Sequence, residues 1–137
     1  MSSNNQSLAQ DINQLALELG ASEATVTITQ SVSSQLSQRE GKVEQCQQSQ
    51  SKGVYVELLV NDRFSAHSAA ETRIEALKPF LKKAIEATHY LEKDPDRKLP
   101  EKQLMGSNNP QTLDALDPSI QERTPSERTQ MLQALEE

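Results

Sequence analysis

The sequence predicts an α+β domain in which two helices pack on one face of a four-stranded antiparallel sheet, in the order α-β-β-β-β-α. Three observations carry this prediction. Apolar residues recur at helical spacing near the N-terminus, at alternate positions through the middle of the chain, and at helical spacing again after residue 72. A linker and a partial helix are expected on the C-terminal side of this domain.

The first expected helix begins at Ser7, which can form a capping box with Gln10, and it ends at Gly20. Its apolar residues are spaced by four, three and four positions, which places them on one face of a helix. Such a face has to be covered by another element. The residues of this face are Leu8, Ile12, Leu15 and Leu19.

Two polar strands are expected next. In the first, Val26, Ile28, Val32 and Leu36 occupy alternate positions in a segment rich in Thr and Ser, which is typical of a half-buried strand. A hairpin turn is expected at residues 39–42, where Gly41 can take a positive φ. The return strand, residues 43–51, has few apolar side chains and is therefore expected at an exposed edge of the sheet.

The composition of these two strands allows a second interpretation. Residues 30–51 contain seven Gln and six Ser, a bias that also occurs in disordered and prion-like segments. We favour polar strands, because the alternation of apolar residues continues into this tract. Disorder stays the alternative.

Two further strands are expected after a turn at residues 51–53. Residues 54–60 form the most apolar segment of the chain, which favours the centre of the sheet. Asn61 and Asp62 suit a two-residue hairpin turn. The fourth strand, residues 63–68, would then direct Phe64 and Ala66 inward.

The second helix is expected from Thr72, which can form a capping box with Glu75. Pro79 lies inside this segment, so the helix either kinks there or has its regular part beginning at Lys78. The apolar side of the helix contains Ile74, Leu77, Leu81, Ala84, Ile85 and Thr88.

Residues that break secondary structure become dense after residue 91, so the compact domain is expected to span 1–106, with a linker at 107–123. Another helix is expected to start in 124–137, because Thr124 precedes Pro125 at the first helical position and Glu127 at the third. The segment ends at Glu136 and Glu137, with no C-cap and with acidic residues at the negative end of the helix dipole. We therefore expect a helix that is cut off, as the start of a following domain.

Composition restricts the classes of function. The chain has 137 residues, a net charge of -6 and 3% aromatic residues, which argues against a surface that follows phosphates and stacks bases. No apolar run approaches the roughly 18–20 residues that a membrane-spanning helix needs. A single cysteine, Cys46, excludes an intrachain disulfide, and the N-terminal residues lack the features of a signal peptide. We expect a cytoplasmic protein that binds neither nucleic acid nor membranes.

The residues that could carry chemistry are isolated. His67 and His89 are 22 positions apart, and neither has a second ligand at helical spacing. Cys46 lies between two glutamines, which favours an inert side chain over a nucleophile. We expect no catalytic, cofactor-binding or metal-binding residue in this chain. Ordinary solvated charges are expected at the acidic pair Glu40 and Glu44 and at the basic patch Lys78, Lys82 and Lys83.

The order of several short motifs resembles the N-terminal domain of the TldD/PmbA family, whose members are also called modulators of DNA gyrase. The similarity begins near residue 8 and covers nearly the whole chain, and residues 99–127 place it closer to the PmbA (TldE) branch. The motifs are Arg39-x-Gly41-Lys42-Val43-Glu44, Gly53-Val54-x-Val56, Val60-Asn61-Asp62-Arg63, Asp94-Pro95, Leu99-Pro-Glu-x-x-Leu104-Met-Gly106, Leu116-Asp117-Pro118 and Thr124-Pro-Ser-Glu127-Arg.

This resemblance implies a cytosolic metallopeptidase system in which TldD and TldE chains form a heterodimer. It implies zinc in the TldD-like subunit alone, since the zinc-binding H-E-x-x-x-H helix has no counterpart here. The chain would then be a non-catalytic scaffold that contacts its partner subunit, as a heterodimer or a homo-oligomer, and a peptide substrate.

The alternative is a free-standing protein-interaction domain without peptidase activity. A direct action on DNA gyrase depends only on the name of the family.

Overall fold

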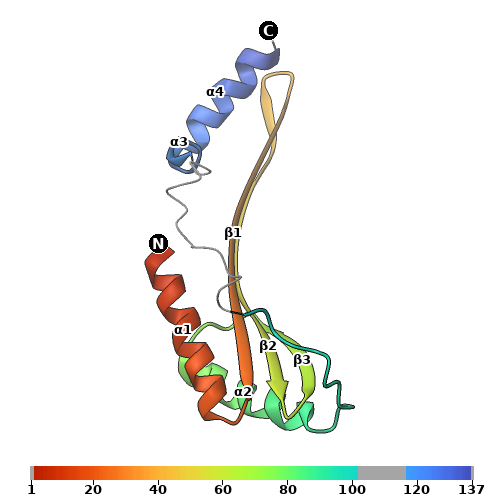
Figure 1. Cartoon of the computed structure of the whole chain (residues 1–137). Coiled ribbons are helices and arrows are strands. Elements are labelled where there is room, and N and C mark those ends of the chain that lie inside the picture. Colours follow the sequence, from red (N-terminus) through yellow and green to blue (C-terminus); the bar gives the residue numbers. More distant parts are fainter. Residues whose placement is uncertain (1, 102–116, 137) are drawn as a thin grey trace. The chain divides into compact units, whose positions relative to one another are not determined.

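A computed structural model describes residues 2–101 and 117–136 of the protein (Figure 1). The described chain divides into two compact units, residues 1–31 with 51–101 (unit 1) and residues 32–50 with 102–137 (unit 2). The elements are α1 (Ser2–Glu18), β1 (Glu23–Arg39), β2 (Lys42–Val60), β3 (Arg63–Ala69), α2 (Ile74–Thr88), α3 (Pro118–Glu122) and α4 (Pro125–Glu136).

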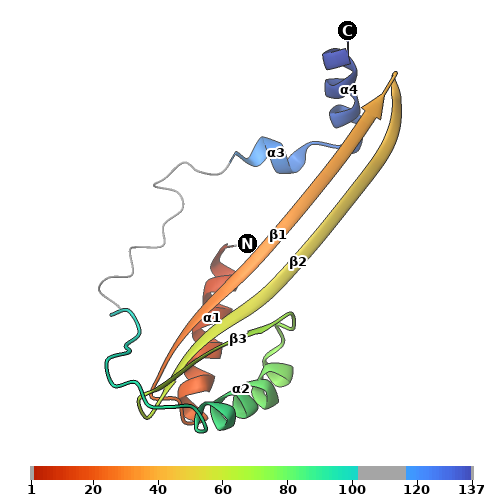
Figure 2. The same cartoon turned by 90° about the vertical axis from the view of Figure 1, so that its right-hand side faces the viewer.

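The sheet has three strands in the order β1-β2-β3, so the expected four-stranded sheet and the order α-β-β-β-β-α are wrong. The difference arises at residues 51–53, where a turn was expected and β2 instead continues without interruption (Figure 2). Gly53 is not among the residues with positive φ. A Cβ at this position would lie 3.4 Å from the carbonyl oxygen of Ala69, an ordinary van der Waals distance, so neither backbone conformation nor space requires a glycine here.

Both hairpin turns use two residues in the left-handed region, which matches the twist of antiparallel strands. Glu40 and Gly41 have φ of 50° and 72°, and they join β1 to β2. Asn61 and Asp62, with φ of 48° and 64°, join β2 to β3. Both turns agree with the sequence prediction.

The second turn sets the register of β2 on β3, which pairs Leu58 with Ser65 and Leu59 with Phe64. Directly opposed residues share a face of the sheet. Because Leu58 faces the helices, Ser65 also faces them and is buried. The expectation that Phe64 and Ala66 point inward is therefore wrong. Phe64 is on the other face, where the guanidinium of Arg97 lies 3.9 Å from the centre of its ring.

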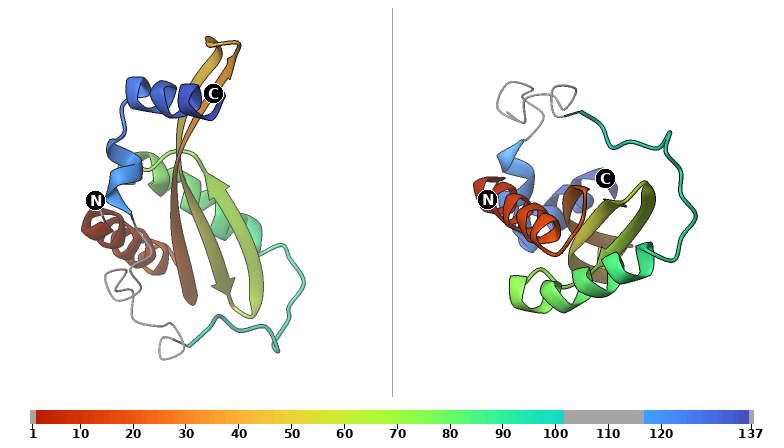
Figure 3. Two further views of the ribbon diagram at one scale, coloured as in Figure 1. Left: turned by 90° about the horizontal axis from the view of Figure 1, so that it is seen from above. Right: turned by 60° about the horizontal axis from the view of Figure 1, so that its bottom comes forward.

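The core of unit 1 forms between one face of β2 and the helices α1 and α2 (Figure 3). Alternate residues of β2 supply the sheet side of the core, and both helices contribute side chains to the same cluster. This is the packing that an α+β domain requires to bury a one-sided sheet. The buried residues are Ile12, Ala16, Ala21, Val54, Val56, Leu58, Val60, Leu77, Leu81, Ala84 and Ile85.

The ends of α1 only partly follow the sequence signals. The helix begins at Ser2, so the expected start at Ser7 is wrong. It ends as expected at Gly20, which has a φ of 111°. The N–H of Gly20 bonds to the carbonyl of Leu17 and the N–H of Ala21 to that of Ala16, which is the Schellman pattern.

At α2 the expected capping box of Thr72 and Glu75 is wrong, because the N-cap is Arg73 and makes no side-chain cap. Glu71 instead accepts hydrogen bonds from the backbone N–H groups of Thr72 and Arg73, at 2.9 and 3.0 Å. The helix continues across Pro79, so its regular part does not begin at Lys78.

The C-terminal segment contains one element that the sequence prediction missed. The helix α3 lies within the expected linker 107–123, and Asp117 caps it by accepting a hydrogen bond from Ser119 N–H at 2.9 Å. The expected domain boundary at residue 106 lies outside the described residues. The predicted start of α4 is confirmed, since Thr124 and Glu127 bond to each other's backbone N–H groups.

Candidate functional site

The residues that could carry chemistry do not come together in the described structure. Cys46 is exposed on β2, and His89 is exposed at the end of α2. The described residues contain no group of three or more His, Cys, Asp or Glu side chains that could hold a metal ion. Lys78, Lys82 and Lys83 are exposed. None of the described helices is long and apolar enough to cross a membrane.

His67 is half-buried on β3, where the sequence interpretation expected a surface histidine. Its Nε2 lies 3.0 Å from the hydroxyl of Ser65, and its ring meets that of Phe80 edge to face, with the centroids 6.3 Å apart. Ser65 and Thr88 share a hydrogen bond of 2.6 Å, and Thr88 donates to the carbonyl of Ala84. These contacts join β3 to α2. Among the described residues, no carboxylate takes part in these contacts to orient the histidine.

Electrostatic pairing in unit 1 is concentrated at the start of α2. The guanidinium of Arg73 donates to both carboxylate oxygens of Glu71, with Nη2–Oε2 at 2.7 Å. These hydrogen bonds, helped by the backbone N–H groups of Arg73 and Thr72, lower the pKa of Glu71 to about 2. The arrangement fixes the loop that leads from β3 into α2.

The hairpin of β1 and β2 offers the first candidate contact surface. In the described structure β3 pairs with β2 only from Val54 to Val60. Opposite Lys42–Gly53, β2 therefore has an edge that β3 does not cover, and its side chains from Lys42 to Ser51 are exposed. Glu40 and Glu44 lie at the tip, where Glu44 is 3.9 Å from Arg39 in an exposed ion pair. Unpaired strand edges can receive an added strand.

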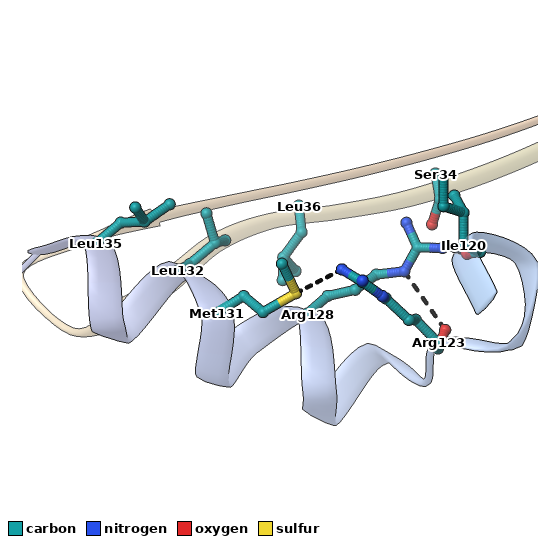
Figure 4. Close-up of a pocket in the computed structure, with 8 residues that line it drawn as sticks. All are labelled: Ser34, Leu36, Ile120, Arg123, Arg128, Met131, Leu132 and Leu135. Carbon is teal, nitrogen blue, oxygen red and sulfur yellow. Dashed lines mark hydrogen bonds between the residues drawn. The ribbon is translucent and has the colours of Figure 1, made fainter. Parts of the chain in front are cut away.

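Unit 2 contains the second candidate surface, a groove of about 300 Å³ between β1 and the helices α3 and α4 (Figure 4). Its apolar side chains face each other across the groove, and two arginines lie at the end near α3. The sequence interpretation missed this groove, although the apolar spacing of residues 131–135 signalled one of its walls. The lining residues are Ser34, Leu36, Ile120, Arg123, Arg128, Met131, Leu132 and Leu135.

The two arginines of the groove bond to neutral groups. Arg128 donates from Nη2 to the carbonyl of Ile120 at 3.1 Å and from Nε to that of Arg123 at 3.4 Å. Arg123 donates from Nη1 to the sulfur of Met131 at 2.9 Å. Among the described residues, ion pairs within 4 Å are formed by Arg39 and Arg73 and not by these two.

Comparison with known proteins gives a matching family model and matching solved structures. Residues 24–88 match the family model described as PmbA/TldA metallopeptidase domain 1. No curated protein matches the sequence.

One matching solved structure is a crystal structure of a candidate modulator of DNA gyrase from Bacteroides thetaiotaomicron, which superposes with a TM-score of 0.83 at 26% sequence identity. The match covers 96% of this chain and 30% of the other. The chain thus spans less than a third of the length of that protein. Both matches agree with the resemblance to the PmbA/TldD N-terminal domain.

Proposed function

Because residues 24–88 match the first domain of the PmbA/TldA metallopeptidases, we propose that the chain is the N-terminal domain of a TldE/PmbA-like subunit in a TldD/TldE-type metallopeptidase system. In this role it is a non-catalytic scaffold that contacts the partner subunit and its peptide substrate. The match of residues 24–88 carries the proposal, since these residues include all of the three-stranded sheet except the first residue of β1, together with α2.

The uncovered edge of β2 supports a contact role. The segment Lys42–Gly53 of β2 is not paired with β3, and it makes up more than half of the length of β2. Its backbone can add a strand of a partner through main-chain hydrogen bonds, while the polar side chains keep the free edge soluble. Such a contact needs neither a metal ion nor a nucleophile in this chain.

The proposal places zinc in a TldD-like subunit and assigns none to this chain. His67 supports this assignment, because its Nε2 contacts Ser65 and its ring packs on Phe80. His89 lies at the other end of α2 from the loop that holds Glu71, and it has no carboxylate partner among the described contacts. Cytoplasmic location is part of the same proposal.

Zinc analysis and a peptidase assay on the purified chain test the proposal. We expect less than stoichiometric zinc and no cleavage of a casein-derived peptide mixture by the chain alone. Adding a zinc-bearing TldD-like chain encoded nearby should give a complex that cleaves the mixture. One tightly held zinc ion per chain, or cleavage by the chain alone, would contradict it.

The alternative function is a free-standing interaction domain. The exposed hairpin favours it equally, because strand addition does not depend on a peptidase. A coding sequence with a stop directly after Glu137 and no TldD-like neighbour would favour the alternative, whereas an uninterrupted reading frame and such a neighbour favour the subunit.

A further inference from the structure

The groove of unit 2 has unusually exposed apolar walls. The described part of unit 2 contributes no residue to the buried core. Of the nine large apolar side chains that are exposed in the described structure, five lie in unit 2: Val32, Val43, Ile120, Met131 and Leu135. Leu135 is 81% exposed although it lines the groove. Clustered apolar exposure of this kind marks a surface that binds another molecule.

The groove also has two chemically different ends. One wall of the groove is α4, whose side chains Met131, Leu132 and Leu135 face β1. Leu36 of β1 lies opposite them (Figure 4). Arg123 and Arg128 lie at the other end, beside Ile120. An occupant that satisfies both ends has apolar side chains and a negative charge at one end.

The hydrogen bonds of the arginines leave donors for such a charge. A guanidinium has five N–H donors, and the described contacts of Arg128 use two of them. Both acceptors are neutral carbonyls, which leave the positive charge uncompensated. The pKa values of Asp117 and Glu127 are lowered mainly by hydrogen bonds with Ser119 and Thr124, and in addition by the charge of Arg123. Because its charge already acts on these two carboxylates, Arg123 is a weaker anchor for a ligand than Arg128.

The net charge of -6 opposes an acidic ligand at long range. At physiological ionic strength, however, charges beyond about 8 Å are largely screened. A carboxylate in direct contact with Arg128 therefore experiences the guanidinium more strongly than the distant acidic residues. Charge-assisted, bidentate hydrogen bonds of this kind are also directional, so they select a carboxylate over other polar groups.

From this geometry we propose that the groove binds a short extended segment of a partner protein that carries one acidic residue followed by apolar residues. The acidic side chain contacts Arg128, and the apolar side chains lie against Leu36, Met131 and Leu135. This inference deepens the proposed function by naming the chemistry of the segment that the contact module binds, and it rests on that function for the identity of the partner.

Fluorescence anisotropy with the full chain tests the inference. The probe is a labelled peptide of sequence Asp-Leu-Ser-Leu-Ser-Leu, and the two controls replace its Asp by Lys or its three Leu by Ser. We expect saturable binding of the probe, and binding at least about tenfold weaker for each control peptide. Higher salt should weaken binding of the probe. Equal binding of the Lys peptide would overturn the proposal.

Two variants locate the binding. R128Q removes the positive charge, and L135S removes an apolar wall at an exposed position, so each should weaken binding about tenfold or more. The matched control is Y90S, since Tyr90 is 91% exposed but belongs to unit 1, and it should bind the probe as the unchanged chain does. R128K, which keeps the charge, should bind better than R128Q.

The outcomes separate this inference from the proposed function. The assay contains no TldD-like chain, so failure of the subunit to associate with such a chain leaves the peptide result standing. If the probe peptide does not bind but the chain still associates with a TldD-like chain, the proposal for the groove is refuted and the proposed function stands. Concentration-dependent self-association that L135S abolishes would overturn the inference, because the occupant would then be a second copy of this chain.

Discussion

The hydroxyl oxygens of Ser65 and Thr88 lie 2.6 Å apart in the interior of unit 1 and join β3 to α2. Thr88 is fully buried and also donates to the carbonyl of Ala84 at 2.7 Å. A β-branched residue of nearly the same shape, valine, can fill this space but cannot make either bond. The pair therefore offers a direct test of how the helix is fixed on the sheet.

T88V should lower the free energy of unfolding by about 1–3 kcal/mol, because the buried hydroxyl of Ser65 loses one of its two hydrogen-bond partners and keeps only His67. T88S, which keeps the hydroxyl, should cost less. In the double variant S65A/T88V both polar groups are gone, so its loss should be smaller than the sum of the single losses. Urea denaturation followed by circular dichroism measures the stability of the unchanged chain and of T88V, T88S, S65A and S65A/T88V. Additive losses would mean that the two hydroxyls are not coupled.

The core and the exposed hairpin should differ sharply in their tolerance of truncation. I12A and L58A each remove a fully buried side chain from the cluster between β2 and the helices, and each should cost about 2–5 kcal/mol. V32A removes a side chain that is 60% exposed, and it should change stability by less than about 0.5 kcal/mol. A large loss in V32A, seen in thermal or urea unfolding, would show that the hairpin belongs to the core.

Two glycines give a matched test of backbone conformation. Gly20 ends α1 at a φ of 111°, a region that side chains rarely adopt, so G20A should lower stability by about 1 kcal/mol or more. Gly53 has ordinary strand geometry and a would-be Cβ contact of 3.4 Å, so G53A should stay within about 0.5 kcal/mol of the unchanged chain. Equal losses of stability in G20A and G53A would contradict the conclusion that Gly20 lies in a turn with positive φ and Gly53 in a continuous strand.

Glu71 should titrate far below the usual range. Its pKa in the folded chain is about 2, lowered from 4.5 mainly by the hydrogen bonds of Arg73. A carboxyl whose pKa is depressed on folding stabilises the fold above its unfolded pKa, and this contribution is lost as the pH falls from 4.5 toward 2. R73Q should raise the pKa of Glu71 toward its ordinary value. Side-chain carbon chemical shifts measured by NMR against pH report both values, and no change in R73Q would refute the assigned cause.

The sequence contained enough information for most elements and both hairpin turns. Periodic apolar residues identified α2, Gly41 and the Asn61–Asp62 pair located the turns, and Thr124 with Glu127 located the start of α4. These signals depend on residues close in the chain, which act through local backbone conformation. The β3 strand, expected at residues 63–68, spans Arg63–Ala69.

The failures came from contacts between distant residues. Ser51-Lys52-Gly53 has the composition of a turn, yet β2 continues through these residues and pairs with β3 from Val54 onward. The inward face of β3 depends on register, which pairs Ser65 with Leu58, and a shift of one residue exchanges the two faces. The groove combines β1 with helices nearly one hundred positions later, so no single segment signals it.

The central claim is that the uncovered edge of β2 is the contact surface for a TldD-like subunit. Successive backbone N–H groups of a strand point to opposite edges of the strand. Proline has no backbone N–H, so one of the two substitutions Q47P and Q48P removes a hydrogen bond to β1, and the other removes a donor from the free edge. The variant whose unfolding is closer to that of the unchanged chain is the one altered at the free edge.

Association of this variant with a separately expressed and purified TldD-like chain, measured by isothermal titration calorimetry, tests the claim most directly. The account predicts that the unchanged chain binds the TldD-like chain and that the free-edge proline variant binds at least about tenfold more weakly, at nearly unchanged stability. Equal affinities for the unchanged chain and this variant would contradict the claim, as would the absence of any binding by the unchanged chain.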